Sequence, residues 1–186
     1  VSRRFVARTQ AEIDAWQERP LGDLDIVALM VDGIEFVDHM LVVALGIDSS
    51  GKKHPLAIRE GTTENAGLCK SLLADIVARG VPADRALLVV IDGGKGLRSA
   101  VRQVFGDYAV VQRCQVHKKR NVLDHLPDHL HGQVSAAMSE AYAAPSSKTG
   151  IGLLERLASS LQKAHPSAVS SLGRVLKRRS RFWTSV

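Results

Sequence analysis

Two aspartates each follow a short apolar run of the chain. Asp32 comes directly after Ile26–Val31, and Asp92 comes directly after Leu87–Ile91. Continuous apolar runs of this length predict buried strands, so each carboxylate would lie at the carboxyl end of its strand. Two carboxylates at neighbouring strand ends can share divalent ions, and two ions about 4 Å apart activate the attacking oxygen and stabilise the leaving oxygen in phosphoryl transfer. We therefore predict that Asp32 and Asp92 bind Mg²⁺ or Mn²⁺, which suit oxygen ligands.

Each aspartate also has a simpler interpretation. A glycine follows both of them, and Asp-Gly after a strand is commonly only a turn. For either aspartate alone, a simple turn is the better interpretation. A topology that places the two aspartates side by side favours the metal site instead. Four other acids lie before the first run or beyond its turn and are predicted to be surface charges: Asp23, Asp25, Glu35 and Asp38.

A glycine-rich segment, Gly93-Gly94-Lys95-Gly96, follows the second aspartate. A Walker phosphate loop would need an earlier glycine and a Ser or Thr after the lysine, and Gly96 stands at that place instead. We interpret the glycines as allowing the backbone and DNA to come close to Asp92, with Lys95 contacting a phosphate. A simple turn from strand to helix explains the same residues equally well.

Cys114 and His117 lie three residues apart in the segment Arg113–Asn121, which is predicted to open a helix. This spacing places both on one helical face, where they could point toward the carboxylates. A zinc site would need two further ligands. His125 and His129 are separated by a proline, and the chain has no second cysteine pair, so we do not predict zinc.

Three consecutive basic residues, Lys118, Lys119 and Arg120, follow in the same segment. Such a cluster can bind the phosphate backbone of DNA, and we predict this contact for all three. A basic face that is simply solvated is the commoner meaning of a run of this kind.

The periodicity along the chain predicts a mixed α/β fold. Three strands form an antiparallel meander, and a helix, a strand, a helix, a strand and further helices follow. This order is the ribonuclease H-like arrangement, with strand order 3-2-1-4-5 and helices on the faces of the sheet. Strands one and four would then be neighbours, so Asp32 and Asp92 would lie about 4.8 Å apart, at the spacing between strands. The predicted strands are 26–31, 40–47, 53–60, 87–91 and 108–111, the predicted helices are 64–79 and 97–104, and the chain from Cys114 onward is predicted to be helical.

The same patterns predict four segments. We expect a lead-in over residues 1–25, a ribonuclease H-like core over 26–125, a helical segment over 126–172 and a basic tail over 173–186.

Composition fits a globular protein that acts on a polyanion. The chain has 186 residues, is 45% hydrophobic and can bury a core. Its net charge of +6 includes five cations in the tail, so the remaining chain is nearly neutral and charge supports DNA binding only weakly. Two cysteines, Cys69 and Cys114, are expected to be reduced thiols. We expect a cytoplasmic protein without membrane contact, because no apolar run reaches 18 residues and the first residues lack a signal peptide.

Taken together, the motifs resemble one family, the mutator-type transposases of bacterial insertion sequences. The likeness covers nearly all of residues 1–172 and extends to Ala141–Pro145. Its Asp-Gly and Cys-x-x-His elements are specific in this order. The matching segments are Met30–Gly33, Val43–Asp48, Val90–Gly96 and Arg113–Asn121.

The resemblance implies a DDE transposase with a ribonuclease H-like core. Asp32 and Asp92 match the first two metal-binding carboxylates, and Cys114 and His117 match a Cys-x-x-His element beside the active site. The implied reaction depends on Mg²⁺ or Mn²⁺: water, and then a DNA 3′-hydroxyl, attacks phosphodiesters at the ends of the element and at the target. The implied partner is DNA, full-length relatives are expected to be homo-oligomers, and the expected location is the bacterial nucleoid.

The chain departs from the family pattern in its second half. The resemblance implies that residues 126–172 are the start of a helical insertion. The third carboxylate of the family is a glutamate beyond that insertion, near a Thr-Asn-x-Ile-Glu-like segment, and no such segment occurs here. Glu155 is the least implausible substitute, and the other downstream acids are expected to be surface charges. After Leu172 the residues match what the usual family codons encode when they are read one nucleotide later, so we infer a frameshift that produced the basic tail.

Three functions remain open from the sequence. The first is a transposase core that is truncated and inactive by itself. The second is a DNA-binding or interfering remnant without catalysis. The third is a compact metal nuclease that uses Asp32, Asp92 and Glu155, which requires the glutamate to come within reach of the metal.

Overall fold

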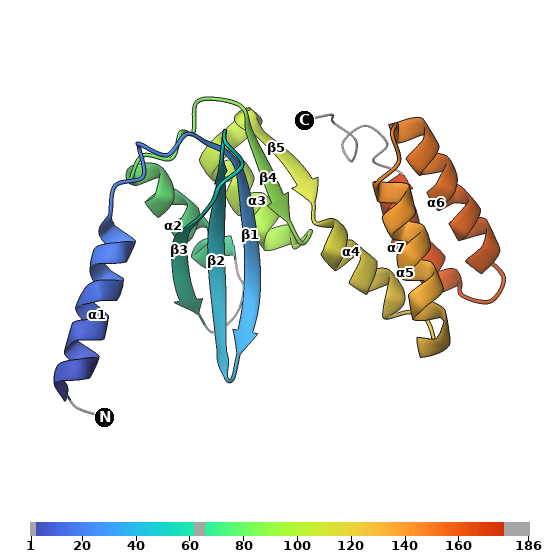
Figure 1. The fold of residues 1–186 in the computed structure, drawn as a ribbon, viewed down its shortest axis with the longest axis horizontal. Coiled ribbons are helices and arrows are strands. Elements are labelled where there is room, and N and C mark those ends of the chain that lie inside the picture. Colours follow the sequence, from blue (N-terminus) through green and yellow to red (C-terminus); the bar gives the residue numbers. More distant parts are fainter. Residues whose placement is uncertain (1–2, 62–65, 177–186) are drawn as a thin grey trace. The chain divides into compact units, whose positions relative to one another are not determined.

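The computed structural model describes residues 3–61 and 66–176 and divides into two compact units, Val1–Val111 and Gln112–Val186 (Figure 1). The predicted boundary at residue 125, between the core and the helical segment, stays a prediction. Most of the predicted basic tail, residues 177–186, lies outside the described residues, whereas Gly173 belongs to the last helix.

A five-stranded mixed sheet forms the centre of unit 1. Its strand order is β3-β2-β1-β4-β5, which confirms the predicted ribonuclease H-like arrangement. The meander pairs β1 with β2 and β2 with β3 in antiparallel fashion, and β1 pairs with β4 in parallel. The strands are β1 (Ile26–Phe36), β2 (His39–Asp48), β3 (Lys53–Gly61), β4 (Leu87–Ile91) and β5 (Ala109–Arg113).

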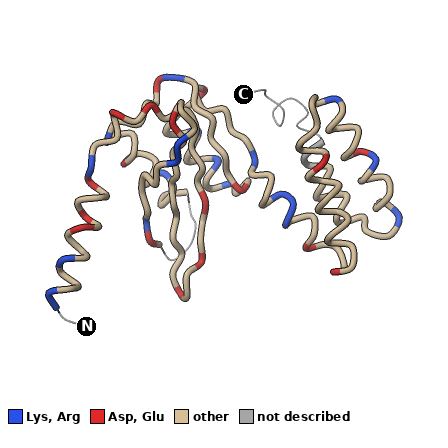
Figure 2. Tube along the Cα trace, viewed as in Figure 1, with Lys and Arg blue, Asp and Glu red and all other residues tan. Residues whose placement is uncertain are grey.

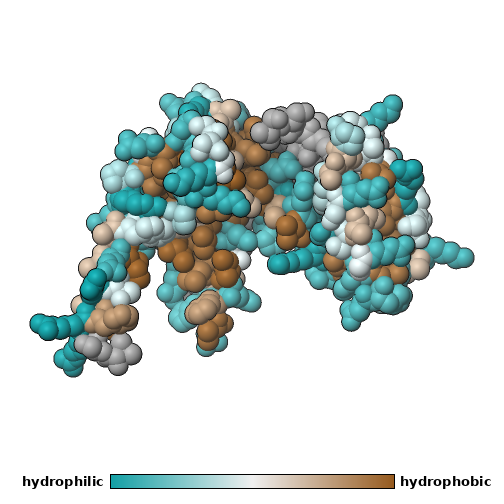
Figure 3. All heavy atoms as spheres, viewed as in Figure 1, coloured by the Kyte–Doolittle hydropathy of each residue, from teal (hydrophilic) through white to brown (hydrophobic). Residues whose placement is uncertain are grey.

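Strand β1 does not end at the first aspartate. It continues through Asp32 and Gly33 to Phe36, so the prediction of a turn at Asp32-Gly33 is wrong. The reason is that β2 pairs with the whole extension, from Asp32 opposite Val43 to Phe36 opposite His39. The extended hairpin carries exposed apolar side chains at Ile34, Phe36 and Val37, and Figure 3 shows hydrophobic residues over this part of unit 1.

Two helices bury their apolar faces in the core of unit 1. α2 (Ala66–Ala78) contributes Cys69, Leu72, Leu73 and Ile76, and α3 (Lys95–Phe105) contributes Leu97, Ala100, Val101 and Phe105. They pack with strand residues such as Leu29, Val31 and Val89. Each fully buried large apolar side chain contributes about 1.5–3 kcal/mol, so this core holds the strand ends in place. The short 3₁₀ helix η1 (Gly106–Tyr108) leads from α3 into β5.

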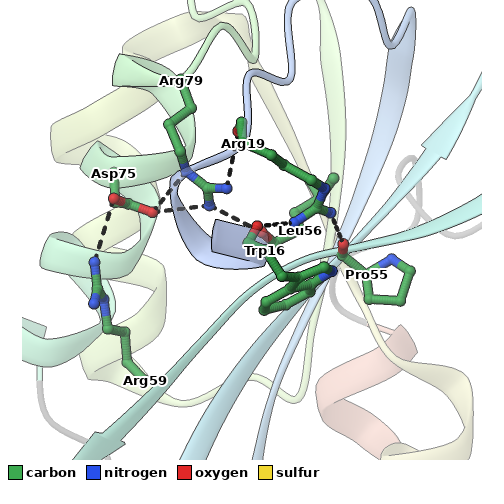
Figure 4. A network of polar contacts seen from close by, with 7 residues as sticks. All are labelled: Trp16, Arg19, Pro55, Leu56, Arg59, Asp75 and Arg79. Atoms are coloured by element: carbon green, nitrogen blue, oxygen red, sulfur yellow. Dashed lines mark hydrogen bonds and ion pairs between the residues drawn. The ribbon is translucent and has the colours of Figure 1, made fainter. Parts of the chain in front are cut away.

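The first helix, α1 (Arg3–Glu18), buries none of its residues. Two arginines connect its end to the rest of unit 1 (Figure 4). The Arg19 guanidinium lies 4.5 Å from the centroid of the Trp16 ring and donates to the carbonyl oxygens of Trp16 and Pro55. Burial, together with the nearby charge of Arg79, lowers the pKa of Arg19.

Arg79 is the second connection. Its guanidinium forms an ion pair with Asp75 at 2.8 Å and donates to the carbonyl oxygen of Leu56 at 2.9 Å. Asp75 also pairs with Arg59 at 3.2 Å, so one carboxylate on α2 joins two cations. The network links α1, α2 and β3, although the sequence pattern predicted no element in the lead-in.

The described part of unit 2 contains four helices around a second apolar core. They are α4 (Gln115–Leu123), α5 (Asp128–Tyr142), α6 (Ser147–Leu161) and α7 (Pro166–Leu176). Val122 of α4 is fully buried with Met138 of α5, Leu154 of α6 and Leu172 of α7. α4 therefore contributes to the helical core of unit 2. Among the described residues, no helix combines the length and apolar character that crossing a membrane requires.

Candidate active site

The two aspartates continue the register of the parallel strands β1 and β4. These strands pair from Ala28 opposite Leu88 to Val31 opposite Ile91, and Asp32 and Asp92 are the next residue of each chain segment. Neighbouring strands are about 4.8 Å apart, so Asp32 and Asp92 stand at adjacent positions just beyond the last β1–β4 pair. Both residues are half-buried. The structure thus brings together the two residues that the strand pattern singled out.

The turn after Asp92 orients its carboxylate. The backbone N–H of Gly94 donates to Asp92 Oδ1 at 2.7 Å, and Gly93 has φ 105, which only glycine adopts without strain. Helix α3 begins at the next residue, Lys95, whose side chain is exposed. The glycines therefore form a strand-to-helix turn, as the simpler interpretation held, and they place the amino end of α3 three residues from the carboxylate.

The donor set fits a hard divalent cation in part. Asp32 within β1 and Asp92 directly after β4 supply the oxygen ligands that Mg²⁺ and Mn²⁺ prefer. Across residues 3–61 and 66–176, no three side chains of His, Cys, Asp or Glu gather closely enough to hold a metal ion. Glu155, the suggested substitute ligand, is exposed on α6 in unit 2.

Cys114 and His117 lie at the start of unit 2. Cys114 directly precedes α4 as its N-cap, His117 lies in the first turn, and both residues are half-buried. The aspartates belong to unit 1, so each pair is positioned by its own unit. The predicted approach of Cys114 and His117 to the carboxylates stays a prediction.

The three basic residues of α4 have different environments, although Figure 2 shows them as one basic stretch. Arg120 is exposed, and Lys119 is half-buried and donates to Ser139 Oγ at 2.9 Å. Lys118 is fully buried, and its ammonium donates to the carbonyl oxygen of Ser171 and to Ser171 Oγ.

The structure therefore corrects the expected surface position of Lys118. This residue lies four positions before Val122, which is buried in the helical core, so both are on the inward face of α4. Lys118, Val122 and Leu126 are spaced four residues apart, and this spacing was the sequence signal that Lys118 is buried. The signal was not used because a charged lysine is expected at the surface.

One residue of unit 2 was missed as a functional candidate. Tyr142, at the end of α5, lines a hollow beside Lys119 and has a buried hydroxyl oxygen. Sequence analysis had noted Tyr142 only as part of the matching segment Ala141–Pro145.

Comparison with known families now decides the classification. The profile described as "Transposase, Mutator family" matches residues 1–183. The chain belongs to this family. A similar relative, the transposase for insertion sequence element IS6120 of Mycolicibacterium smegmatis, is 38% identical over 147 residues, which are 76% of this chain and 45% of that protein.

A second relative of this Mutator-family chain is a probable transposase for an insertion sequence element of Corynebacterium diphtheriae. It is 32% identical over 166 residues, which are 85% of this chain and 48% of that protein. The chain thus spans about half the length of these curated relatives.

Among solved structures, a chain of the simian T-cell lymphotropic virus intasome in complex with PP2A regulatory subunit B56 gamma matches with a TM-score of 0.32 and 15% identity. The match covers 81% of this chain and 48% of that chain. The fold assignment rests on the strand order of this molecule instead.

Proposed function

We propose that this Mutator-family chain is the catalytic core of an insertion-sequence transposase, which cleaves and joins DNA with the help of divalent metal ions. The observation that carries the proposal is the register of β1 and β4, because it makes Asp32 and Asp92 neighbours at the end of their pairing. The names of the relatives support the substrate class, since they are transposases of insertion sequence elements.

Asp32 and Asp92 would hold the metal. When bound, Mg²⁺ or Mn²⁺ supplies activation of the attacking oxygen and stabilisation of the leaving oxygen. The residues of the chain do the positioning. Pairing between β1 and β2 holds Asp32 in a regular strand, and the Gly94 N–H fixes one oxygen of Asp92.

The amino end of α3 would attract the scissile strand. The first backbone N–H groups of a helix carry partial positive charge and bind phosphate readily. Lys95 adds a full positive charge at this end and is exposed. We propose that Lys95 and the first turn of α3 contact a DNA phosphate beside Asp92.

In this proposal, Asp32 and Asp92 are only part of the set of metal ligands that strand transfer needs. The sequence contains no segment like the third-carboxylate motif of the family. We propose that strand transfer needs one more carboxylate than the aspartate pair and that this chain alone is inactive. A DNA-binding role without catalysis is the second candidate, favoured by the exposed Arg120 on α4.

A nicking assay tests the catalytic proposal. The substrate is a duplex that carries the ends of the element, and the proteins are this chain and a longer version with the third carboxylate restored. We expect Mg²⁺-dependent nicking by the longer version only, and loss of nicking by at least about a hundredfold in its Asp32→Asn and Asp92→Asn variants. Asp38→Asn is the matched control, because Asp38 is an exposed acid in the nearby hairpin turn.

Two results would contradict the proposal. Nicking by the longer version that survives Asp32→Asn would show that the aspartate pair is not the metal site. Binding of the duplex that is lost in a Lys119→Ala, Arg120→Ala double variant, with no metal-dependent nicking in any version, would favour the role without catalysis.

A further inference from the structure

Two helices of unit 2 form a hollow between their facing sides. α4 contributes Gln115, Val116 and Lys119, and these residues lie three and four positions apart, hence on one helical face. α5 contributes Ser139 and Tyr142, and Ala143, the C-cap of α5, follows with the same spacing. The hollow has a volume of about 270 Å³.

The walls of the hollow are aromatic and aliphatic. Tyr142 lines it, and the Tyr142 hydroxyl oxygen is buried and has no hydrogen-bond partner among the described residues. Burial raises the pKa of Tyr142 to about 12, with Arg113 opposing and Cys114 adding to the shift. The tyrosine is therefore neutral and offers a ring face rather than a hydroxyl. Val116 and Ala143, both exposed, extend this surface.

The polar groups of the hollow are cationic or neutral. Lys119 Nζ donates to Ser139 Oγ at 2.9 Å across the two helices, and both residues line the same hollow as Tyr142. Gln115 adds an amide that can both donate and accept. The six lining residues include no acid, and the exposed Arg120 follows Lys119 on α4.

A flat ring surface beside a held cation matches one ligand chemistry, an aromatic base that carries a phosphate. Base stacking on an aromatic side chain tolerates any sequence, because every base has a π face. An ammonium at the edge of such a surface attracts the phosphate as a point charge.

We propose that this hollow binds one unpaired nucleotide of a DNA strand, with its base against Tyr142 and its phosphate near Lys119. The inference rests on the proposed DNA-processing function and adds a specific contact to it. Extruding a base from a duplex costs least where the base is already unpaired. The chain therefore prefers DNA that contains an unpaired base over fully paired DNA.

Fluorescence titration tests the proposal, with the whole chain and without metal, so that catalysis plays no part. One probe is a duplex with a single bulged 2-aminopurine, and the other is the same duplex with that base paired. We expect about tenfold tighter binding of the bulged duplex, accompanied by a change in 2-aminopurine fluorescence. Free deoxyadenosine monophosphate, as a third probe, is expected to bind far more weakly than the bulged duplex.

Four variants assign the contact. Tyr142→Phe keeps the ring and is expected to keep the preference, whereas Tyr142→Leu keeps apolar volume but loses it. Ala143→Leu fills the hollow from an exposed position and is expected to abolish the preference without unfolding the helices. Lys119→Gln is expected to weaken the binding of both duplexes. It should also reduce the slope of log affinity against log salt concentration by about one. Lys148→Gln, at an exposed position on α6, is its matched control.

The outcomes separate this inference from the proposed function. Equal affinity for the two duplexes, or a preference that survives both Ala143→Leu and Tyr142→Leu, overturns the nucleotide site and leaves the aspartate proposal standing. Binding of the free nucleotide as tight as that of the bulged duplex also overturns it, since the site would then serve a free nucleotide. Binding of neither duplex would remove the DNA-processing function together with the inference.

Discussion

At Lys118, a cation is held inside a helical core by oxygen acceptors. Its ammonium donates to the Ser171 carbonyl and hydroxyl oxygens, and Ser171 Oγ donates to the carbonyl oxygen of Asn121 at 3.2 Å. The lysine thus connects α4 with α7 from within unit 2. Its aliphatic stem fills core volume, while its charge is compensated by these acceptors.

Truncation of Lys118 tests this role. Lys118→Ala leaves a cavity and removes the donor from the Ser171 oxygens, so we expect a loss of about 2–4 kcal/mol in the free energy of unfolding. The measurement is urea denaturation followed by circular dichroism. Arg120→Ala, two residues further on at an exposed position, is expected to change stability by less than about 0.5 kcal/mol. Equal effects of the two variants would mean that Lys118 faces solvent.

Asp48 makes the β2–β3 connection sensitive to acid. Hydrogen bonds from Ser50 and His54 to its carboxylate, with backbone N–H donors of Lys52 and Ser50, hold the pKa of Asp48 well below its usual range. A lowered folded-state pKa adds stability above the unfolded pKa of about 3.9, and this stability is lost as the pH falls further. The wild-type protein should therefore lose stability below about pH 4.

The melting temperature between pH 7 and pH 2.5 measures this effect. Asp48→Asn is expected to be less stable at pH 7 and to show a flatter decline below pH 4. Asp38→Asn, at the tip of the other hairpin, should follow the wild-type curve. An acid decline of Asp48→Asn as steep as that of the wild type would contradict the assignment.

At the scale of elements, the β1–β2 hairpin contains a strained turn. Two residues, Val37 and Asp38, connect the strands, and Val37 has φ 55 whereas Asp38 does not have positive φ. Positive φ at the first residue of a two-residue connection is the feature of a type II′ turn, which favours glycine there. A β-branched residue in this conformation costs about 1–3 kcal/mol.

Relief of this strain is the expected effect of Val37→Gly. We expect the free energy of unfolding to rise by about 1 kcal/mol, since the released strain exceeds the entropy that glycine adds to the unfolded chain. Asp38→Gly introduces the same flexibility without relieving strain, so it should lower stability slightly. Thermal denaturation compares the two variants. A lower stability of Val37→Gly would show that the valine side chain stabilises the turn.

The elements also show how far the sequence could predict the fold. Apolar runs located all five strands, because a buried strand needs apolar residues on both faces. The apolar runs did not predict where β1 ends. Asp32-Gly33 has the composition of a turn, but this part of the chain pairs with β2 and remains a strand. They also missed α1, because this helix buries no residue and its attachment depends on Arg19 and Arg79 contacts between distant segments.

The candidate site was predictable to the extent that it depends on strand order. Asp32 and Asp92 were identified because a meander followed by crossovers fixes which strands are neighbours. The environment of Lys118 and the hollow beside Tyr142 depend on how α4 packs against α5 and α7, and spacing along one helix does not determine that packing.

At the scale of the whole molecule, each unit has its own core and its own candidate contact with DNA. Unit 1 holds the aspartate pair just beyond the last β1–β4 pair, and unit 2 presents Lys119, Arg120 and the Tyr142 hollow on its helices. The central claim concerns unit 1, where we propose that the aspartate pair binds metal ions that assist phosphoryl transfer.

Titration of Mn²⁺ into the whole chain, followed by electron paramagnetic resonance of the free ion, tests that claim most directly. We expect saturable binding by the wild type and by Asp38→Asn, and binding at least about tenfold weaker in Asp32→Asn and in Asp92→Asn, since even the partners of metal ligands contribute that much. Binding that is unchanged in both Asp32→Asn and Asp92→Asn would contradict it.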